Sequence, residues 1–138
     1  MIIKFKWKRR KVRREITGTQ AFTREDIEAL KKKAHKEIPP RVEYYAQMMG
    51  LDYNRIAIRC QKTRWGSCSS KGNLNFNCLL MLCPEDVRDY VIVHELCHLK
   101  QMNHSPQFWA EVGRVIPDYK EQRKWLRTEG QKLISKIR

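Results

Sequence analysis

The residues most able to do chemistry lie between positions 94 and 104. His94-Glu95-Leu96-Cys97-His98 reads H-E-x-x-H, and on a helix its two imidazoles lie one turn apart on the same face, where both can reach one metal ion. Glu95 lies beside them and can take a proton from a metal-bound water, whose pKa the ion lowers toward neutrality. The pattern predicts a metal-activated nucleophile with a carboxylate general base.

His104 lies six residues after His98 and supplies a third imidazole. Three protein ligands leave a fourth position open for water or substrate, which distinguishes a catalytic zinc site from a closed structural one. The alternative is a helix face of buried, inert histidines, but three of the four histidines fall within eleven residues. We therefore predict that His94, His98 and His104 bind one Zn²⁺ ion, although imidazoles also accept other transition metals. His35 lies among lysines without a partner and is expected at the surface.

Two further runs accompany this motif, KTRWGSCSSKGN at positions 62–73 and MNHSPQFW at positions 102–109. With the helix that ends in His94-Glu95-Leu96-Cys97-His98-Leu99, they make residues 55–118 resemble the YgjP-like metallopeptidase family, relatives of the SprT-like zincins. The resemblance implies a minimal zincin, in which a small sheet packs against the active-site helix and its edge strand pairs with an extended substrate. It also implies that the three histidines are the metal ligands and Glu95 the catalytic base. Gln101 replaces the metzincin glycine, and the segment before Thr23 is short, so substrate selection built there can differ.

Four more residues are candidates for contacts with substrate or transition state. Arg64 can stabilise a developing oxyanion or bind a phosphate, and Tyr90 can do the former unless its helical turn points it into the core. Trp65 can pack beside the site, although its segment serves equally well as a bulge that supports the helix. Asn75 lies in the strand around Asn73–Asn77, which either adds substrate to a sheet edge or is an ordinary amphipathic strand.

The N-terminal half of the chain predicts helix followed by strands. Thr23-Arg24-Glu25-Asp26 resembles a capping box, so a helix begins there. Pro39-Pro40 should kink or interrupt it, which gives two helical pieces before Gly50. Alternation over residues 55–60 predicts a strand.

A turn at Lys71-Gly72-Asn73 separates that region from a second predicted strand, Leu74–Leu80. Trp65–Cys68 is then expected in a connection or bulge, and the strands in a hairpin or meander. Helical spacing predicts the central helix from Pro84, a helix opened by Ser105-Pro106, and a last helix from about Lys120.

The net charge of +14 is concentrated at the ends of the chain. Residues 1–20 hold eight Lys or Arg against Glu15, and residues 120–138 hold seven against Glu121 and Glu129. These basic ends can attract nucleic acid or another polyanion, or they can be solvated faces that keep the protein soluble. Residues 2–7 alternate apolar and basic side chains, as in a half-exposed strand or a basic arm.

The five cysteines contain no C-x-x-C pair, and the first residues lack the apolar core of a signal peptide. Free thiols in a reducing cytoplasm are the expectation. The longest apolar run, Cys78–Cys83, is far shorter than the roughly 20 residues that span a bilayer, so we expect no membrane association.

Together these patterns predict one α+β domain over residues 1–138, a small three-stranded sheet packed on an active-site helix and several further helices. The predicted function is zinc-dependent hydrolysis of peptide bonds, with protein or peptide substrates and Glu95 activating the water. Two alternatives stay open. One is a metal-dependent hydrolase of phosphoanhydrides such as nucleotides, and the other is an SprT-like protease localised on nucleic acid by the basic ends.

Overall fold

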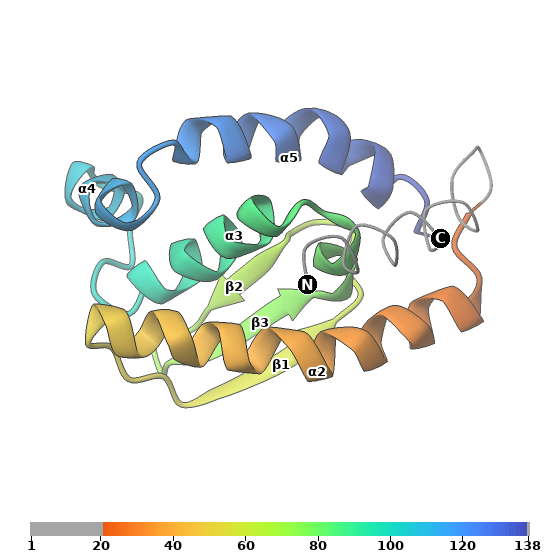
Figure 1. Cartoon of the computed structure of the whole chain (residues 1–138), viewed down its shortest axis with the longest axis horizontal. Coiled ribbons are helices and arrows are strands. Elements are labelled where there is room, and N and C mark those ends of the chain that lie inside the picture. The colour runs from red at the N-terminus through yellow and green to blue at the C-terminus, as the bar shows by residue number, and fades with distance from the viewer. Residues whose placement is uncertain (1–20, 138) are drawn as a thin grey trace.

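The computed structural model describes residues 21–137, so the predicted strand at residues 2–7 and the rest of the basic segment lie outside the described part. The elements follow in the order α2 (Arg24–Met49), β1 (Arg55–Arg59), β2 (Gly66–Cys68), β3 (Asn73–Asn77), the 3₁₀-helix η1 (Cys78–Leu82), α3 (Glu85–Cys97), α4 (Pro106–Val115) and α5 (Tyr119–Ile134) (Figure 1). This is the predicted α+β fold with a small three-stranded sheet. None of the described helices is long and apolar enough to cross a bilayer.

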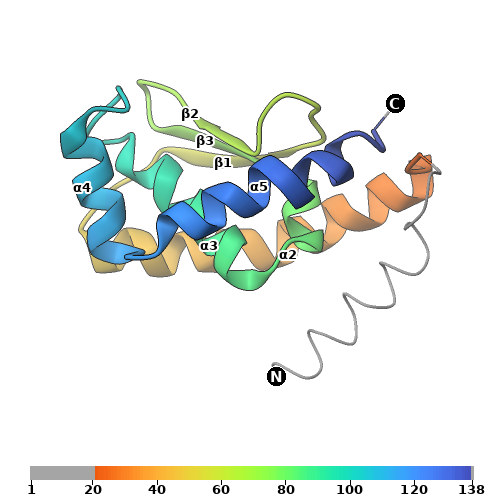
Figure 2. The ribbon, with the colours of Figure 1, turned by 90° about the horizontal axis from the view of Figure 1, so that it is seen from above.

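The sheet is mixed and has the strand order β1-β3-β2. β3 pairs in parallel with β1 and antiparallel with β2, and Gly72, with a φ of 80° that suits glycine, lies in the turn between β2 and β3. Leu74 and Phe76 of β3 are fully buried and lie beside Ile56 and Ile58 of β1. These apolar side chains therefore share one side of the sheet, and α2 and α3 pack against the strands (Figure 2).

Two predictions about the strands are wrong, and one of the two alternatives left open for Asn73–Asn77 is excluded. Gly66–Cys68, expected in a connection or bulge, forms β2 because it pairs with Leu74–Phe76. The second strand ends at Asn77 instead of Leu80, since the Asn77 side chain accepts a hydrogen bond from the Leu79 N–H and caps η1. Asn73–Asn77 is also the central strand, with both of its edges paired. Substrate cannot add to β3, and the sheet edge nearest α3 belongs to β2.

α2 is one helix and not two pieces, although Pro39 and Pro40 lie inside it. A proline inside a helix costs about 3 kcal/mol through a lost hydrogen bond and a steric clash. Ile38 and Val42 are fully buried and Leu30 nearly so, and burying each such side chain contributes roughly 1.5–3 kcal/mol. This apolar stripe packs on η1 and α3 and keeps the helix continuous across the prolines. Gly50 ends it in the left-handed conformation, as predicted.

Charged side chains tie the first half of α3 to α2. Asp89 accepts hydrogen bonds from the Arg41 guanidinium at 3.0 and 2.8 Å and from the Tyr45 hydroxyl at 3.0 Å. The buried Arg88 lies 3.5 Å from Glu37. Because hydrogen bonds to a charged group are directional and strong, this network fixes the rotation of α3 about its axis and thereby the direction of the side chains one turn later.

Candidate metal centre and active site

The three predicted imidazoles converge where α3 ends. His94 lies in the last turn of α3, His98 is its C-cap, and His104 precedes the N-cap of α4. Their ligand nitrogens all lie within 4.8 Å of one another, and the Nε2 atoms of His94 and His104 are 3.2 Å apart. Two nitrogens bound at 2.0–2.1 Å to one tetrahedral zinc ion would be about 3.3 Å apart. The donor set and its spacing therefore fit a metal ion such as zinc.

Local backbone structure holds the second and third histidines in place. The His98 Nδ1–H donates to the Gln101 carbonyl at 3.0 Å, which leaves the Nε2 lone pair of the neutral ring free for a metal. Ser105 caps α4, its hydroxyl accepting from the Phe108 N–H at 3.3 Å, and Pro106 occupies the first turn. Because α4 starts at once, His104 is fixed against the end of α3.

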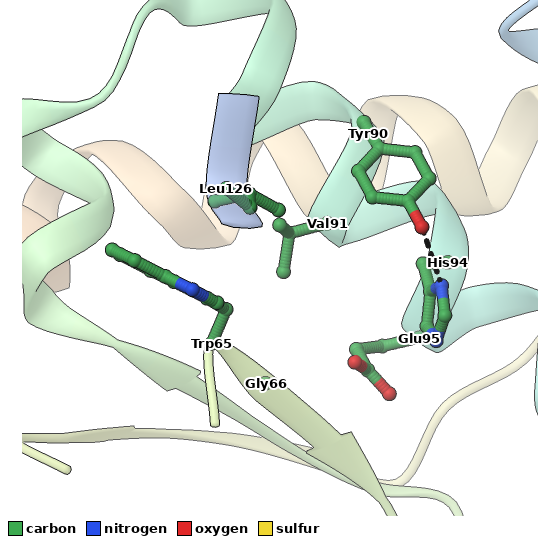
Figure 3. Close-up of a pocket in the computed structure, with 7 residues that line it drawn as sticks. All are labelled: Trp65, Gly66, Tyr90, Val91, His94, Glu95 and Leu126. Carbon is green, nitrogen blue, oxygen red and sulfur yellow. Dashed lines mark hydrogen bonds between the residues drawn. The ribbon is translucent and has the colours of Figure 1, made fainter. Parts of the chain in front are cut away.

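Tyr90 lies behind His94, where its hydroxyl is 3.1 Å from Nδ1 (Figure 3). When the proton of the neutral imidazole is on Nδ1, this nitrogen donates to the Tyr90 oxygen and Nε2 is free to bind a metal. Burial, together with the nearby imidazoles of His98 and His104, lowers the pKa of His94 to about 3. The ring is therefore neutral at physiological pH, which is the form that binds metals.

Two aromatic side chains of α4 pack on His98 and His104. Phe108 stacks on His98 with 4.4 Å between ring centroids, and Trp109 stacks on His104 at 5.8 Å. The Arg123 guanidinium of α5 lies 4.4 Å from the centre of the Trp109 ring. Phe108 and Trp109 entered the sequence comparison only as the end of the run MNHSPQFW, and no contact with the histidines was predicted for them. Their position four and five residues after His104, across a helix N-cap, was the available signal for these ring contacts.

Glu95 is buried, 6% exposed, and borders β2. A Cβ atom added to Gly66 would lie 3.0 Å from Cγ and 3.1 Å from Oε2 of Glu95, so only glycine lets the edge strand pass this close to the carboxyl group. Burial raises the pKa of Glu95 to about 8, against the opposing effect of the Arg64 charge. The carboxyl group is thus poised to gain or lose a proton near neutral pH.

A polar cavity of about 230 Å³ opens onto the imidazoles. Its walls combine the three histidines and Glu95 with residues of β2 and the adjoining loops: Arg64, Gly66, Ser67, Cys68 and Met102. Arg64, one of the candidate contact residues, lines this cavity, whereas Ser67, Cys68 and Met102 were not among the candidates. Trp65 lines a second cavity that shares His94, Glu95 and Gly66 with the first (Figure 3).

Asn75 lines neither of these two cavities. It lies in the central strand, and its side-chain amide donates to the Ser67 hydroxyl at 3.1 Å, so it supports β2 from behind. Asn77 is a support that the sequence did not reveal: its amide donates to the carbonyls of Gln61 and Arg64 at 2.9 and 3.0 Å. These contacts hold the loop before β2, and no local pattern reports them because they join separate elements.

An α+β fold in which three imidazoles and a buried glutamate face an edge strand is that of a metallopeptidase, and similar solved structures agree. The metallopeptidase zymogen of Pyrococcus abyssi abylysin is 27% identical, with a TM-score of 0.59 over 67% of this chain and 95% of that chain. The metallopeptidase zymogen of Methanocaldococcus jannaschii jannalysin is 25% identical, with a TM-score of 0.51 over 56% and 80% of the two chains. The model of the YgjP-like metallopeptidase domain matches residues 3–129, and the chain belongs to this family. No match is found among curated proteins.

Proposed function

We propose that this metallopeptidase uses one zinc ion, held by His94, His98 and His104, and that Glu95 is its general base. The observation that carries the proposal is the convergence of three imidazole nitrogens within 4.8 Å beside a buried carboxyl group. Three ligands leave a coordination position open, as catalytic zinc sites require.

A bound zinc ion supplies a Lewis acid that polarises the peptide carbonyl and acidifies water. Glu95 accepts the proton of the attacking water and then donates it to the leaving amine. Its buried position beside β2 supports both roles, because a carboxylate whose pKa is raised toward neutral pH is a stronger base toward water, and its acid form can still pass the proton to the more basic leaving amine. Arg64 brings positive charge to the same cavity and stabilises the oxyanion that forms on the carbonyl oxygen.

The substrate backbone binds along β2. One edge of β2 pairs with β3, and Gly66, Ser67 and Cys68 all line the cavity that contains the histidines. An extended peptide added to a sheet edge gains backbone hydrogen bonds whatever its sequence. The close approach of Gly66 to Glu95 brings such a peptide beside the proposed base. The substrate pairing considered as one alternative for Asn73–Asn77 is therefore proposed for the neighbouring strand, β2.

The test combines metal analysis with activity. We expect the protein to bind about one zinc ion per chain and to cleave unstructured proteins. His98→Ala should bind no zinc and cleave no protein. His35→Ala is the matched control, because this exposed histidine of α2 lies outside the cluster of three. Glu95→Gln should retain zinc and lose at least about 10³-fold in kcat/KM, as expected when the group that moves the proton is removed.

The same proteins are assayed on nucleotides, since the phosphoanhydride alternative predicts phosphate release. Zinc-loaded protein that releases phosphate and cleaves no peptide would exclude the proposal. Binding of zinc by His98→Ala as tightly as by the parent would exclude the ligand assignment and leave the peptidase class standing.

A further inference from the structure

The second cavity beside Glu95 lies between three elements and has walls of a different character from the first. It encloses about 200 Å³ and is lined by Trp65, Gly66, Tyr90, Val91, His94, Glu95 and Leu126 (Figure 3). Trp65 precedes β2, Val91 belongs to α3 and Leu126 to α5. The polar cavity holds His98, His104 and Arg64 instead, so Glu95 stands between an imidazole-lined space and an apolar one.

Burial, a backbone hydrogen bond and close packing hold the apolar residues of this cavity in place. Val91 and Leu126 are buried, and the Trp65 carbonyl accepts a hydrogen bond from the Asn77 N–H at 2.9 Å. On the side of α5, a Cβ atom added to Gly130 would lie 2.9 Å from Cζ2 of Trp65, so glycine allows the helix to close against the indole ring. The Tyr90 hydroxyl, a polar group of the wall, is engaged by His94. The remaining polar groups of the wall are the Glu95 carboxyl group and the indole N–H of Trp65, which is buried without a hydrogen-bond partner among the described residues. Because Val91, Leu126 and the aromatic rings make up most of the rest, an apolar side chain is favoured there over an acidic one.

The volume suits one side chain. A cavity of about 150 Å³ lined by aliphatic and aromatic residues can hold benzene, so about 200 Å³ accommodates a side chain of the size of leucine, methionine or phenylalanine. Because Gly66, at the start of β2, borders both cavities, a peptide that follows this strand past Glu95 presents a neighbouring side chain to this space.

We propose that the cavity formed by Trp65, Val91 and Leu126, called here the Trp65 cavity, is a specificity pocket for an apolar residue that adjoins the scissile bond. This inference rests on the proposed peptidase function. It makes Leu126, from a helix distant in sequence from the metal-binding motif, a specificity-determining residue.

The experiment uses fluorogenic peptides that differ only at the residues on either side of the cleaved bond, where leucine, phenylalanine, alanine or aspartate is placed. On one side of the bond, zinc-loaded parent protein should prefer leucine or phenylalanine over alanine by at least about 10-fold in kcat/KM, the scale of discrimination by a hydrophobic pocket. Leu126→Phe, which fills the Trp65 cavity, should reverse this order in favour of alanine. Leu126→Ala should shift it toward phenylalanine. Gln131→Phe, at an exposed position of α5, controls for an added aromatic ring.

The outcomes of this experiment test the peptidase function and the specificity pocket separately. Zinc-loaded parent protein that cleaves no peptide would remove the proposed function. Cleavage without an apolar preference, or with a preference that Leu126→Phe leaves unchanged, would overturn the pocket while the peptidase stands. If the Leu126 variants do not fold, the affinity of Glu95→Gln for uncleaved leucine and alanine peptides decides: about 10-fold tighter binding of leucine supports the pocket, and equal affinity overturns it.

Discussion

The two halves of α3 bury ionisable groups in opposite ways. In the first half, Asp89 is surrounded by hydrogen-bond donors from Arg41 and Tyr45. In the second half, His94 lies against two other imidazoles, and Glu95 is buried enough that its pKa rises to about 8. Breaking a buried pair destabilises the fold because the remaining group loses its partner, whereas a buried group without a partner costs stability in the folded protein itself. The first half of α3 therefore anchors the domain, and the second half holds a site that a metal ion can complete.

The largest effect is expected at the anchored half. Asp89→Ala leaves Arg41 and the Tyr45 hydroxyl without their shared acceptor, and we expect a loss of about 3 kcal/mol in the free energy of unfolding. Urea denaturation of the metal-free protein measures it. Glu129→Ala, which breaks the surface pair with Lys132, should cost less than about 1 kcal/mol. Equal losses in the two variants would contradict the distinction between anchored and surface charge.

In the second half of α3, removing the negative charge of Glu95 should stabilise the metal-free protein. Burial raises the pKa of Glu95 to about 8, above its value of about 4.3 in an unfolded chain. Ionisation therefore opposes folding, and this cost grows as the pH rises from about 4 to 8 and then levels off. We expect Glu95→Gln to be more stable than the parent at pH 7 in a chelator, by up to about 3 kcal/mol, and no more stable near pH 4. A gain independent of pH would show that the charge of Glu95 is not its cause.

The smallest effects are expected when a hydroxyl group is removed from Tyr90, which contacts His94, or from Tyr45, which contacts Asp89. Tyr90→Phe removes the partner of His94 Nδ1, and loss of such a support typically weakens metal binding 10- to 100-fold. We expect about 10-fold weaker zinc binding in competition with a chelator, with little change in the stability of the metal-free protein. Tyr45→Phe removes a hydroxyl from Asp89 instead and should lower stability by about 1 kcal/mol without changing zinc affinity. A loss of zinc affinity in both variants would mean that Tyr90 acts only through the fold.

The convergence of His94, His98 and His104 could be predicted because its geometry is local. His94 and His98 share a helix face, and Ser105-Pro106 marks the next helix start directly after His104, so spacing alone carries most of the arrangement. The order of the strands could not be predicted in this way. β1 pairs with β3, and β2 lies outside β3, which depends on packing between distant segments.

Dependence on packing between distant segments also explains the individual predictions that were wrong. Gly66–Cys68 has only three residues and no alternation to reveal a strand, yet it forms the edge beside the site. Pro39 and Pro40 favour a break, but burial of Ile38 and Val42 outweighs this local preference. Leu126 meets the site through α5, and no spacing in the sequence connects it with Glu95.

The outer strands of the sheet also differ in how they meet other molecules. β1 carries the exposed Arg55 and Arg59 at its two ends, and charges on an edge strand discourage pairing with a second copy of the chain. β2 lacks such charges, but its three residues are too few to template a fibril or a stable intermolecular sheet. The protein can therefore keep an edge accessible at high concentration without aggregating through it, since only a partner that also fills the adjoining cavities would remain there.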